Sequence, residues 1–78
     1  MTRKQYFVVF DQIGWNVRRA GDYISGPYPT QKDAIGKAID MAHADGKAGH
    51  DAQVIVQGDN HAFRTEWTYG HDPYPPKG

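Results

Sequence analysis

Two short runs of consecutive apolar residues constrain the fold of this chain more than any other feature. The runs are residues 6–10 and residues 54–56. Successive side chains of a strand point to opposite faces of a sheet, so a strand that is apolar at every position has both faces covered. We therefore expect residues 5–10 and 51–57 to form two central strands of one sheet.

The first run is followed by a turn and a segment that alternates between apolar and polar residues. Residues 11–14 carry the turn, and residues 15–18 (Trp-Asn-Val-Arg) have the alternation of a half-buried strand. A four-residue loop predicts a hairpin in which Phe10 faces Trp15 and Val8 faces Val17.

The second run is followed by a similar arrangement. Residues 58–61 (Gly-Asp-Asn-His) form a tight turn, and residues 62–69 form the partner strand. With Asp59 and Asn60 at the centre of the turn, Val56 pairs with Phe63 and Val54 with Thr65. Phe63, Thr65 and Trp67 would then share one face, while Ile55, Arg64 and Glu66 would share the other.

One helix separates the two hairpins. Thr30 is a suitable N-cap, and the carboxylate of Asp33 favours a helix start at Gln31. Gly46 and Gly49 are the stop signals. The apolar stripe consists of Ala34, Ile35, Ala38, Ile39, Met41 and Ala42. Residues 20–29 hold two glycines and two prolines without a sustained period, and we expect them to form a loop.

These elements predict an α+β fold with the order strand, strand, helix, strand, strand. The doubly apolar strands take the middle of a four-stranded sheet in the order second, first, third, fourth. Because the helix reverses the chain after the second strand, the sheet is expected to be antiparallel throughout. The helix covers one face, and the side with Trp15, Phe63 and Trp67 suits its stripe. Residues 1–69 form a single domain, and residues 70–78 form a proline-rich tail.

Composition excludes several classes of protein. The 78 residues contain no cysteine, so disulfides and thiolate metal sites are excluded. The formal net charge is zero, which gives no general attraction to nucleic acid or anionic membranes. No stretch approaches the roughly 20 apolar residues of a membrane span. We expect a cytoplasmic protein, and its small core makes self-association a serious alternative to a monomer.

The sequence holds no local motif for catalysis or cofactor binding. Its four histidines fall in the helix, a loop, a turn and the tail, and no two have the spacing of a metal motif. Ser25, the only serine, lacks the glycine-flanked elbow of a nucleophile. No glycine-rich phosphate loop joins a strand to a helix. We predict a protein that is not an enzyme and has no cofactor or metal.

The uncovered sheet face is the predicted contact surface. It would have an apolar centre of Phe7, Val9 and Ile55 inside a polar rim, the composition of a binding site. The rim would consist of Asn16, Arg18, Gln53, Gln57, Arg64 and Glu66. The tail favours an extended polyproline conformation. It would fold back to place Tyr74 on the apolar strip, be presented to a partner, or stay disordered.

Three parts of the chain resemble a family of short bacterial proteins catalogued as a domain of unknown function, number 2188. They are the hairpin residues Gly14-Trp15-Asn16-Val17, the helix start Thr30-Gln31-Lys32-Asp33-Ala34-Ile35, and the ending Tyr69-Gly70-His71-Asp72-Pro73-Tyr74-Pro75-Pro76-Lys77-Gly78. The chain departs from the family at Thr68 and in a longer loop over residues 21–29. The resemblance implies a compact bacterial intracellular protein, supplies no catalytic residue, and gives the tail a role.

Two functions follow as hypotheses. The first is a non-enzymatic module that contacts a protein, or its own copy, through the open face or the tail. The second is a weak binder of single-stranded nucleic acid on the same face. There Phe7 would stack on a base and Arg18 and Arg64 would contact phosphates. The candidate binding residues are Phe7, Val9, Arg18, Ile55, Arg64 and Tyr74.

Overall fold

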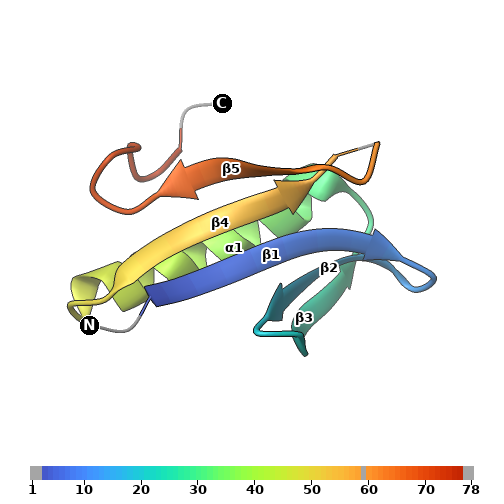
Figure 1. Ribbon diagram of the computed structural model, residues 1–78, viewed down its shortest axis with the longest axis horizontal. Coiled ribbons are helices and arrows are strands. Elements are labelled where there is room, and N and C mark those ends of the chain that lie inside the picture. The colour runs from blue at the N-terminus through green and yellow to red at the C-terminus, as the bar shows by residue number, and fades with distance from the viewer. Residues whose placement is uncertain (1–2, 59, 77–78) are drawn as a thin grey trace.

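A computed structural model describes residues 3–58 and 60–76 and has one sheet with a single helix against one of its faces (Figure 1). The elements in chain order are β1 (Arg3–Asp11), β2 (Gly14–Arg19), β3 (Asp22–Tyr28), α1 (Gln31–Lys47), β4 (Asp51–Gln57) and β5 (Phe63–Thr68). The sheet has five strands in the order β3-β2-β1-β4-β5. The α+β class, the single helix and the relative order of the four predicted strands are confirmed.

The prediction of a loop over residues 20–29 is wrong, because residues 22–28 form β3. Ala20 and Gly21 both have positive φ, as in the tight turns that join hairpin strands. Glycine and proline break central strands but are tolerated at bulges and on edge strands. β3 is such a strand, since it pairs only with β2 and its register shifts twice along that pairing.

The prediction of a fully antiparallel sheet is wrong for the same reason. β3 adds one reversal of the chain before α1, so β4 emerges from the helix parallel to β1. The parallel ladder includes the pairs Tyr6 with Val54 and Val8 with Val56. The β1–β2, β2–β3 and β4–β5 pairs are antiparallel. The sheet is therefore mixed.

The predicted register of the first hairpin is confirmed. Phe10 pairs with Trp15 and Val8 with Val17. The carboxylate of Asp11 accepts a hydrogen bond from the backbone N–H of Ile13 at 3.0 Å, which stabilises the turn.

The predicted register of the second hairpin is wrong by one residue. Gln57 pairs with Phe63 and Val56 with Arg64. Inside the turn, His61 has a φ of 63°, the left-handed conformation that closes loops longer than two residues. A non-glycine residue adopts this conformation infrequently, so the sequence carries no clear sign of the longer loop.

This slip exchanges the two faces of β5 over its first half. Phe63 and Thr65 lie on the uncovered side, beside Gln57 and Ile55, whereas Arg64 lies with Val56 on the helix side. A bulge at Glu66 restores the alternation, because Ile55 pairs with Thr65 and Val54 with Trp67. Trp67 therefore occupies its predicted face, and Arg64 and Glu66 do not.

The core lies between α1 and the central strands. Thr30 caps the helix as predicted, its hydroxyl accepting a hydrogen bond from the N–H of Asp33 at 3.1 Å. The buried core residues are Tyr6, Val8, Val17, Ala34, Ala38, Ile39, Ala42, Ala52, Val54, Val56 and Trp67. Alanines on the helix let α1 approach the sheet closely. Gly46 allows a similarly close approach to Tyr69, since a Cβ at this position would lie 2.2 Å from the Tyr69 ring.

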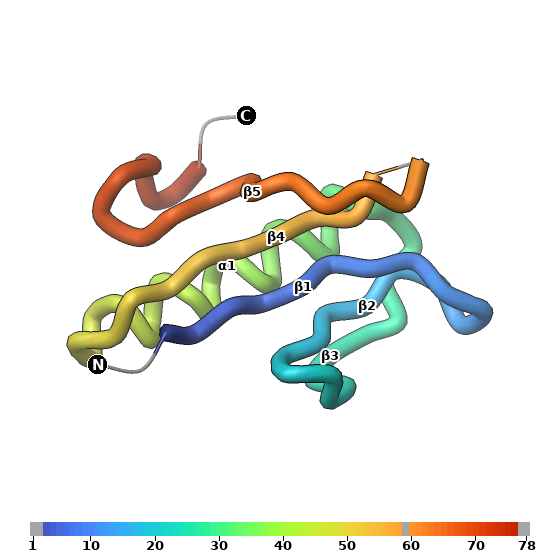
Figure 2. Tube along the Cα trace, viewed as in Figure 1, coloured from blue at the N-terminus to red at the C-terminus, as the bar shows by residue number. Residues whose placement is uncertain are grey.

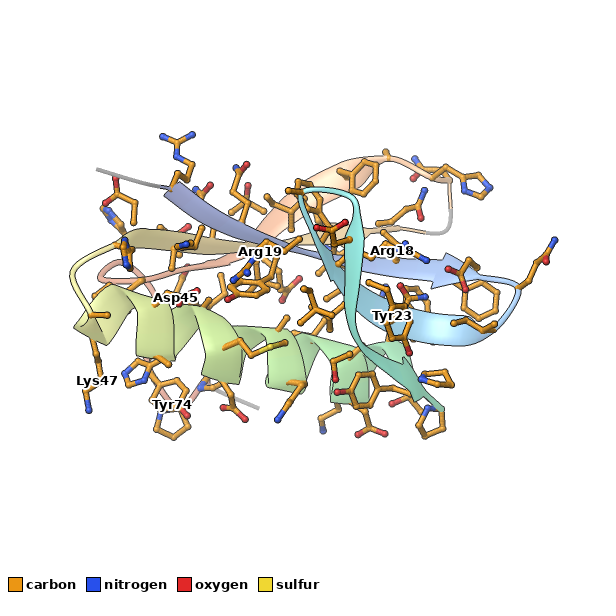
Figure 3. All side chains as sticks on the ribbon, turned by 90° about the horizontal axis from the view of Figure 1, so that it is seen from below. Arg18, Arg19, Tyr23, Asp45, Lys47 and Tyr74 are labelled. Atoms are coloured by element: carbon orange, nitrogen blue, oxygen red, sulfur yellow. The ribbon has the colours of Figure 1, made fainter. Side chains whose placement is uncertain are left out.

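The tail turns back after β5 (Figure 2), with a turn at residues 69–71 and bends at residues 72, 74 and 75. The prediction of an extended polyproline conformation is therefore wrong for these residues, because hydrogen bonds to the carbonyl of Thr68 close the turn. Tyr74 reaches α1, where its hydroxyl donates a hydrogen bond to Asp40 at 2.8 Å. Figure 3 shows Tyr74 at the level of the helix, away from Arg18. The alternative that placed Tyr74 on the open apolar strip is therefore wrong, because aromatic partners on the helix side hold its ring.

Candidate functional site on the open sheet face

The open face of the sheet has an apolar centre supplied by three strands. Phe7 and Val9 come from β1, Ile55 from β4 and Phe63 from β5. Phe7 and Ile55 are direct neighbours across the parallel ladder. The rings of Phe7 and Phe63 meet edge to face with centroids 5.9 Å apart. Phe63 is 54% exposed, so the edge of the apolar centre is accessible to solvent.

Uncharged polar side chains border this centre on the side of β4 and β5 and at the start of β1. Gln5 donates a hydrogen bond to Gln53 at 3.1 Å, which links β1 to β4 at one end of the strip. Gln57 and Thr65 extend the same side of the sheet. Amides and hydroxyls both donate and accept hydrogen bonds, so this part of the rim is not selective for one sign of charge.

The β1–β2 end of the face carries a small polar network centred on Asn16. Asn16 is fully buried, and its amide donates to the carboxylate of Asp11 at 3.0 Å and to the carbonyl of Gly14 at 3.1 Å. Arg18 donates to Asn16 at 3.0 Å and pairs with Asp11 at 3.1 Å. These contacts explain how a buried polar residue is accommodated on an open face.

The pKa of Asp11 lies below its ordinary value because several donors face its carboxylate. The largest cause is the hydrogen bond from the backbone N–H of Ile13, followed by the one from Asn16. Arg18 adds a further hydrogen bond and its positive charge. The guanidinium also lies 5.7 Å from the ring centroid of Tyr23 on β3 (Figure 3). Arg18 is thus engaged within the protein.

The structure brings four of the six predicted site residues together. Phe7, Val9, Arg18 and Ile55 all lie on the open face. Arg64 lies on the helix side, where it forms an ion pair with Glu66 at 3.2 Å, because the β4–β5 register differs by one residue. Tyr74 lies against α1. Phe63 is the main residue that the sequence interpretation missed, and its position depends on the conformation of His61.

The open face combines apolar side chains with amides and hydroxyls. Within residues 3–58 and 60–76, no group of three or more acidic or histidine side chains is arranged to hold a metal ion. The described part of the chain likewise has no buried side-chain nitrogen or oxygen without a hydrogen-bond partner. Aromatic edges, aliphatic side chains and amides can bind a flat, largely uncharged surface. The absence of catalytic activity stays a prediction.

Comparisons with known proteins support the assignment to a family but add no function. Among the described residues, no helix is long and apolar enough to cross a membrane. Neither a curated protein nor a solved structure matches the chain. The model of the family described as "Uncharacterized protein conserved in bacteria (DUF2188)" matches residues 6–69, which covers β1 from Tyr6 onward, the other four strands and the helix, and leaves out the tail. The chain therefore belongs to the DUF2188 family of bacterial proteins.

Proposed function

We propose that this protein is a non-enzymatic interaction module that self-associates through its open sheet face. The observation that carries the proposal is the edge-to-face pair of half-buried Phe7 and exposed Phe63, beside half-buried Val9 and buried Ile55. Covering such an apolar strip with a second copy of this 78-residue chain would lower the free energy, because burial of apolar area is the main source of association energy.

A second copy is the partner that best fits the chemistry of the face. Two-fold dimers bring identical patches together, so each group must tolerate its own kind or a neighbour on the same patch. Phe7, Phe63 and the rim amides meet this requirement, because aromatic rings pair with one another and glutamines donate and accept. The zero net charge of the chain adds no long-range repulsion between copies.

Sedimentation equilibrium of the full chain and of two matched variants tests the proposal. Phe63→Glu places a charge at the exposed edge of the strip and should weaken dimerisation by roughly 100-fold or more, since a buried unpaired charge is costly. Ile13→Glu is the control, because Ile13 is 55% exposed but lies at the tip of the β1–β2 hairpin. We expect the control to dimerise like the unmodified protein.

Two results would overturn the proposal. One is an unmodified protein that stays monomeric at about 1 mM. The other is a dimer that Phe63→Glu leaves intact. A monomer that instead binds single-stranded oligonucleotides, with affinity that falls steeply with salt and depends on Phe63, would favour the nucleic-acid function. Arg64→Glu would not affect such binding, because Arg64 lies on the other side of the sheet.

A further inference from the structure

The segment after β5 is seated on the domain through specific contacts of one tyrosine. The ring of Tyr74 stacks on His43 with centroids 3.7 Å apart and planes 8° apart. It also meets the edge of Trp67 at 6.4 Å. Its hydroxyl donates to Asp40, and this hydrogen bond raises the pKa of Tyr74 above its ordinary value. Tyr74 nevertheless stays 44% exposed, so the ring lies on the surface rather than in the core.

The preceding residues are held by hydrogen bonds to the end of β5. The indole N–H of Trp67 donates to the carbonyl of Pro73 at 2.9 Å. The carboxylate of Asp72 accepts a hydrogen bond from the backbone N–H of Thr68 at 2.8 Å. An indole donor to a proline carbonyl, next to stacked aromatic rings, is chemistry that protein modules use to bind extended proline-rich segments.

The site continues beyond the tail as a groove between α1 and β5. Its volume is about 440 Å³. The groove is lined by Gln31, Lys32, Ile35, Gly36, Ile39, Arg64, Glu66 and Pro76. β5 is an edge strand, so its outer backbone groups are not paired with another strand of this sheet. A groove between an edge strand and a helix can accept an extended chain.

We propose that the surface of His43, Trp67 and Asp40 is a docking site for a segment of a partner protein that has a tyrosine between prolines and bends there as the tail does. The chain's own residues 72–76 occupy this site as an intramolecular ligand. The family match ends at Tyr69, so these residues lie outside the matched domain and pack onto it. A longer partner segment would follow the groove past Ile39 toward Lys32.

Intramolecular occupancy sets the affinity that such a partner must reach. A ligand joined by a short linker is present at an effective concentration on the order of millimolar. A free segment therefore competes poorly with the intact tail, and better once the tail is weakened. Replacing Tyr74 removes both the ring stack and the hydrogen bond to Asp40, and it changes none of the residues of α1 and β5 that line the groove.

The test uses a fluorescent peptide with the sequence of residues 71–78, titrated with full-length protein. The Tyr74→Ala variant should bind this peptide at least roughly tenfold more tightly than the unmodified protein, because the competing tyrosine is absent. Tyr74→Phe keeps the ring stack and loses the hydrogen bond to Asp40, so it should give an intermediate affinity. A peptide with alanine in place of tyrosine should bind neither protein.

A second substitution locates the binding. Adding His43→Ala to Tyr74→Ala should abolish the gain, while adding Phe63→Glu should preserve it, since Phe63 lies on the other face of the sheet. Equal affinity for the unmodified protein and Tyr74→Ala would overturn the proposal. Undetectable binding by a Tyr74→Ala variant with unchanged helical circular dichroism would also overturn it, as would a gain that survives His43→Ala. None of these results depends on the open-face dimer.

Discussion

The two faces of the sheet are built from the same strands but differ in how their side chains are satisfied. On the covered face, Val8, Val54 and Val56 are fully buried against the alanines of α1. On the open face, Phe7 and Val9 of the same β1 strand are only half-buried, and Phe63 is exposed. One helix can cover one face only. Of the apolar residues on the open face, only Ile55 is buried, so Phe7, Val9 and Phe63 keep apolar surface that the core does not use.

The largest expected effect is a difference in stability between substitutions of two neighbouring valines of β1. Val8→Ala should lower the free energy of unfolding by about 2–3 kcal/mol, because it leaves a cavity in the covered face. Val9→Ala removes the same atoms from the open face and should cost less than about 1 kcal/mol in the monomer. Urea denaturation of dilute protein measures both. Equal losses would show that the two faces are packed alike.

Gly46→Ala tests how closely α1 approaches the tyrosine that follows β5. A methyl group there would overlap the ring of Tyr69, which must shift or leave. Overpacking of this kind typically costs about 1–3 kcal/mol. Gly36→Ala on the same helix is the control, because a Cβ at Gly36 meets no atom within 4 Å. It should stabilise the helix slightly, since alanine favours helix over glycine. Thermal unfolding compares the two, and a stabilised Gly46→Ala would contradict the observed packing.

Tyr6→Phe tests the one hydroxyl that joins the covered face to the helix end. The hydroxyl of Tyr6 donates to Asp45 at 2.5 Å and accepts from Arg19 at 3.1 Å, so its loss should cost about 1 kcal/mol at pH 8. Figure 3 labels both partners, Arg19 on β2 and Asp45 on α1.

The same hydroxyl gives a pH dependence. Burial, and then the hydrogen bond to Asp45, raise the pKa of Tyr6 above the ordinary 10.0. The stability that the hydroxyl contributes is thus complete below pH 10 and is lost as the pH rises through the raised value. Urea denaturation at pH 8 and above pH 11 should show the unmodified protein losing its advantage over Tyr6→Phe. A constant difference between the two proteins would contradict this assignment.

The smallest expected effect on stability is at the open face. Phe63→Ser should change the free energy of unfolding of the monomer by less than about 1 kcal/mol, because the ring is mostly in solvent. Phe10 is 60% exposed and does not lie on the open face. Phe10→Ser should therefore cause a similarly small change in the free energy of unfolding in dilute solution. Only Phe63→Ser should weaken the proposed dimer. If Phe63→Ser instead caused a large loss of monomer stability, Phe63 would belong to the core, and the open face would contribute to folding as the covered face does.

The sequence predicts those parts of the fold that depend on local patterns. The helix boundaries follow from Thr30 and the alanine stripe, and the first hairpin follows from a short turn held by Asp11. The sequence did not predict β3 because Gly26 and Pro27 are typical of loops. A strand can contain them at the edge of a sheet, but which strand lies at the edge is known only from the whole fold. The parallel pairing of β1 and β4 was missed as a consequence.

The candidate site was predicted in part for a related reason. Phe7, Val9 and Ile55 belong to strands whose two-sided apolar pattern is independent of register. Arg64 and Phe63 belong to a strand whose faces depend on the number of residues in one turn. His61 adopts a left-handed conformation that is usually marked in a sequence by glycine. Because no glycine stands there, the sequence interpretation assigned Arg64 and Phe63 to the wrong faces of β5.

The parallel pairing of β1 and β4 also governs when the protein can fold as it is synthesised. Gln5 and Gln53 are hydrogen-bonded to each other although 48 residues separate them in the chain. Closing so long a loop costs entropy that local hairpins do not pay, and contacts of this kind slow folding. The strands β1, β2 and β3 can pair early on the ribosome. Their apolar surfaces stay exposed until α1 and β4 have emerged, which makes the nascent chain dependent on residues 31–57 for protection against aggregation.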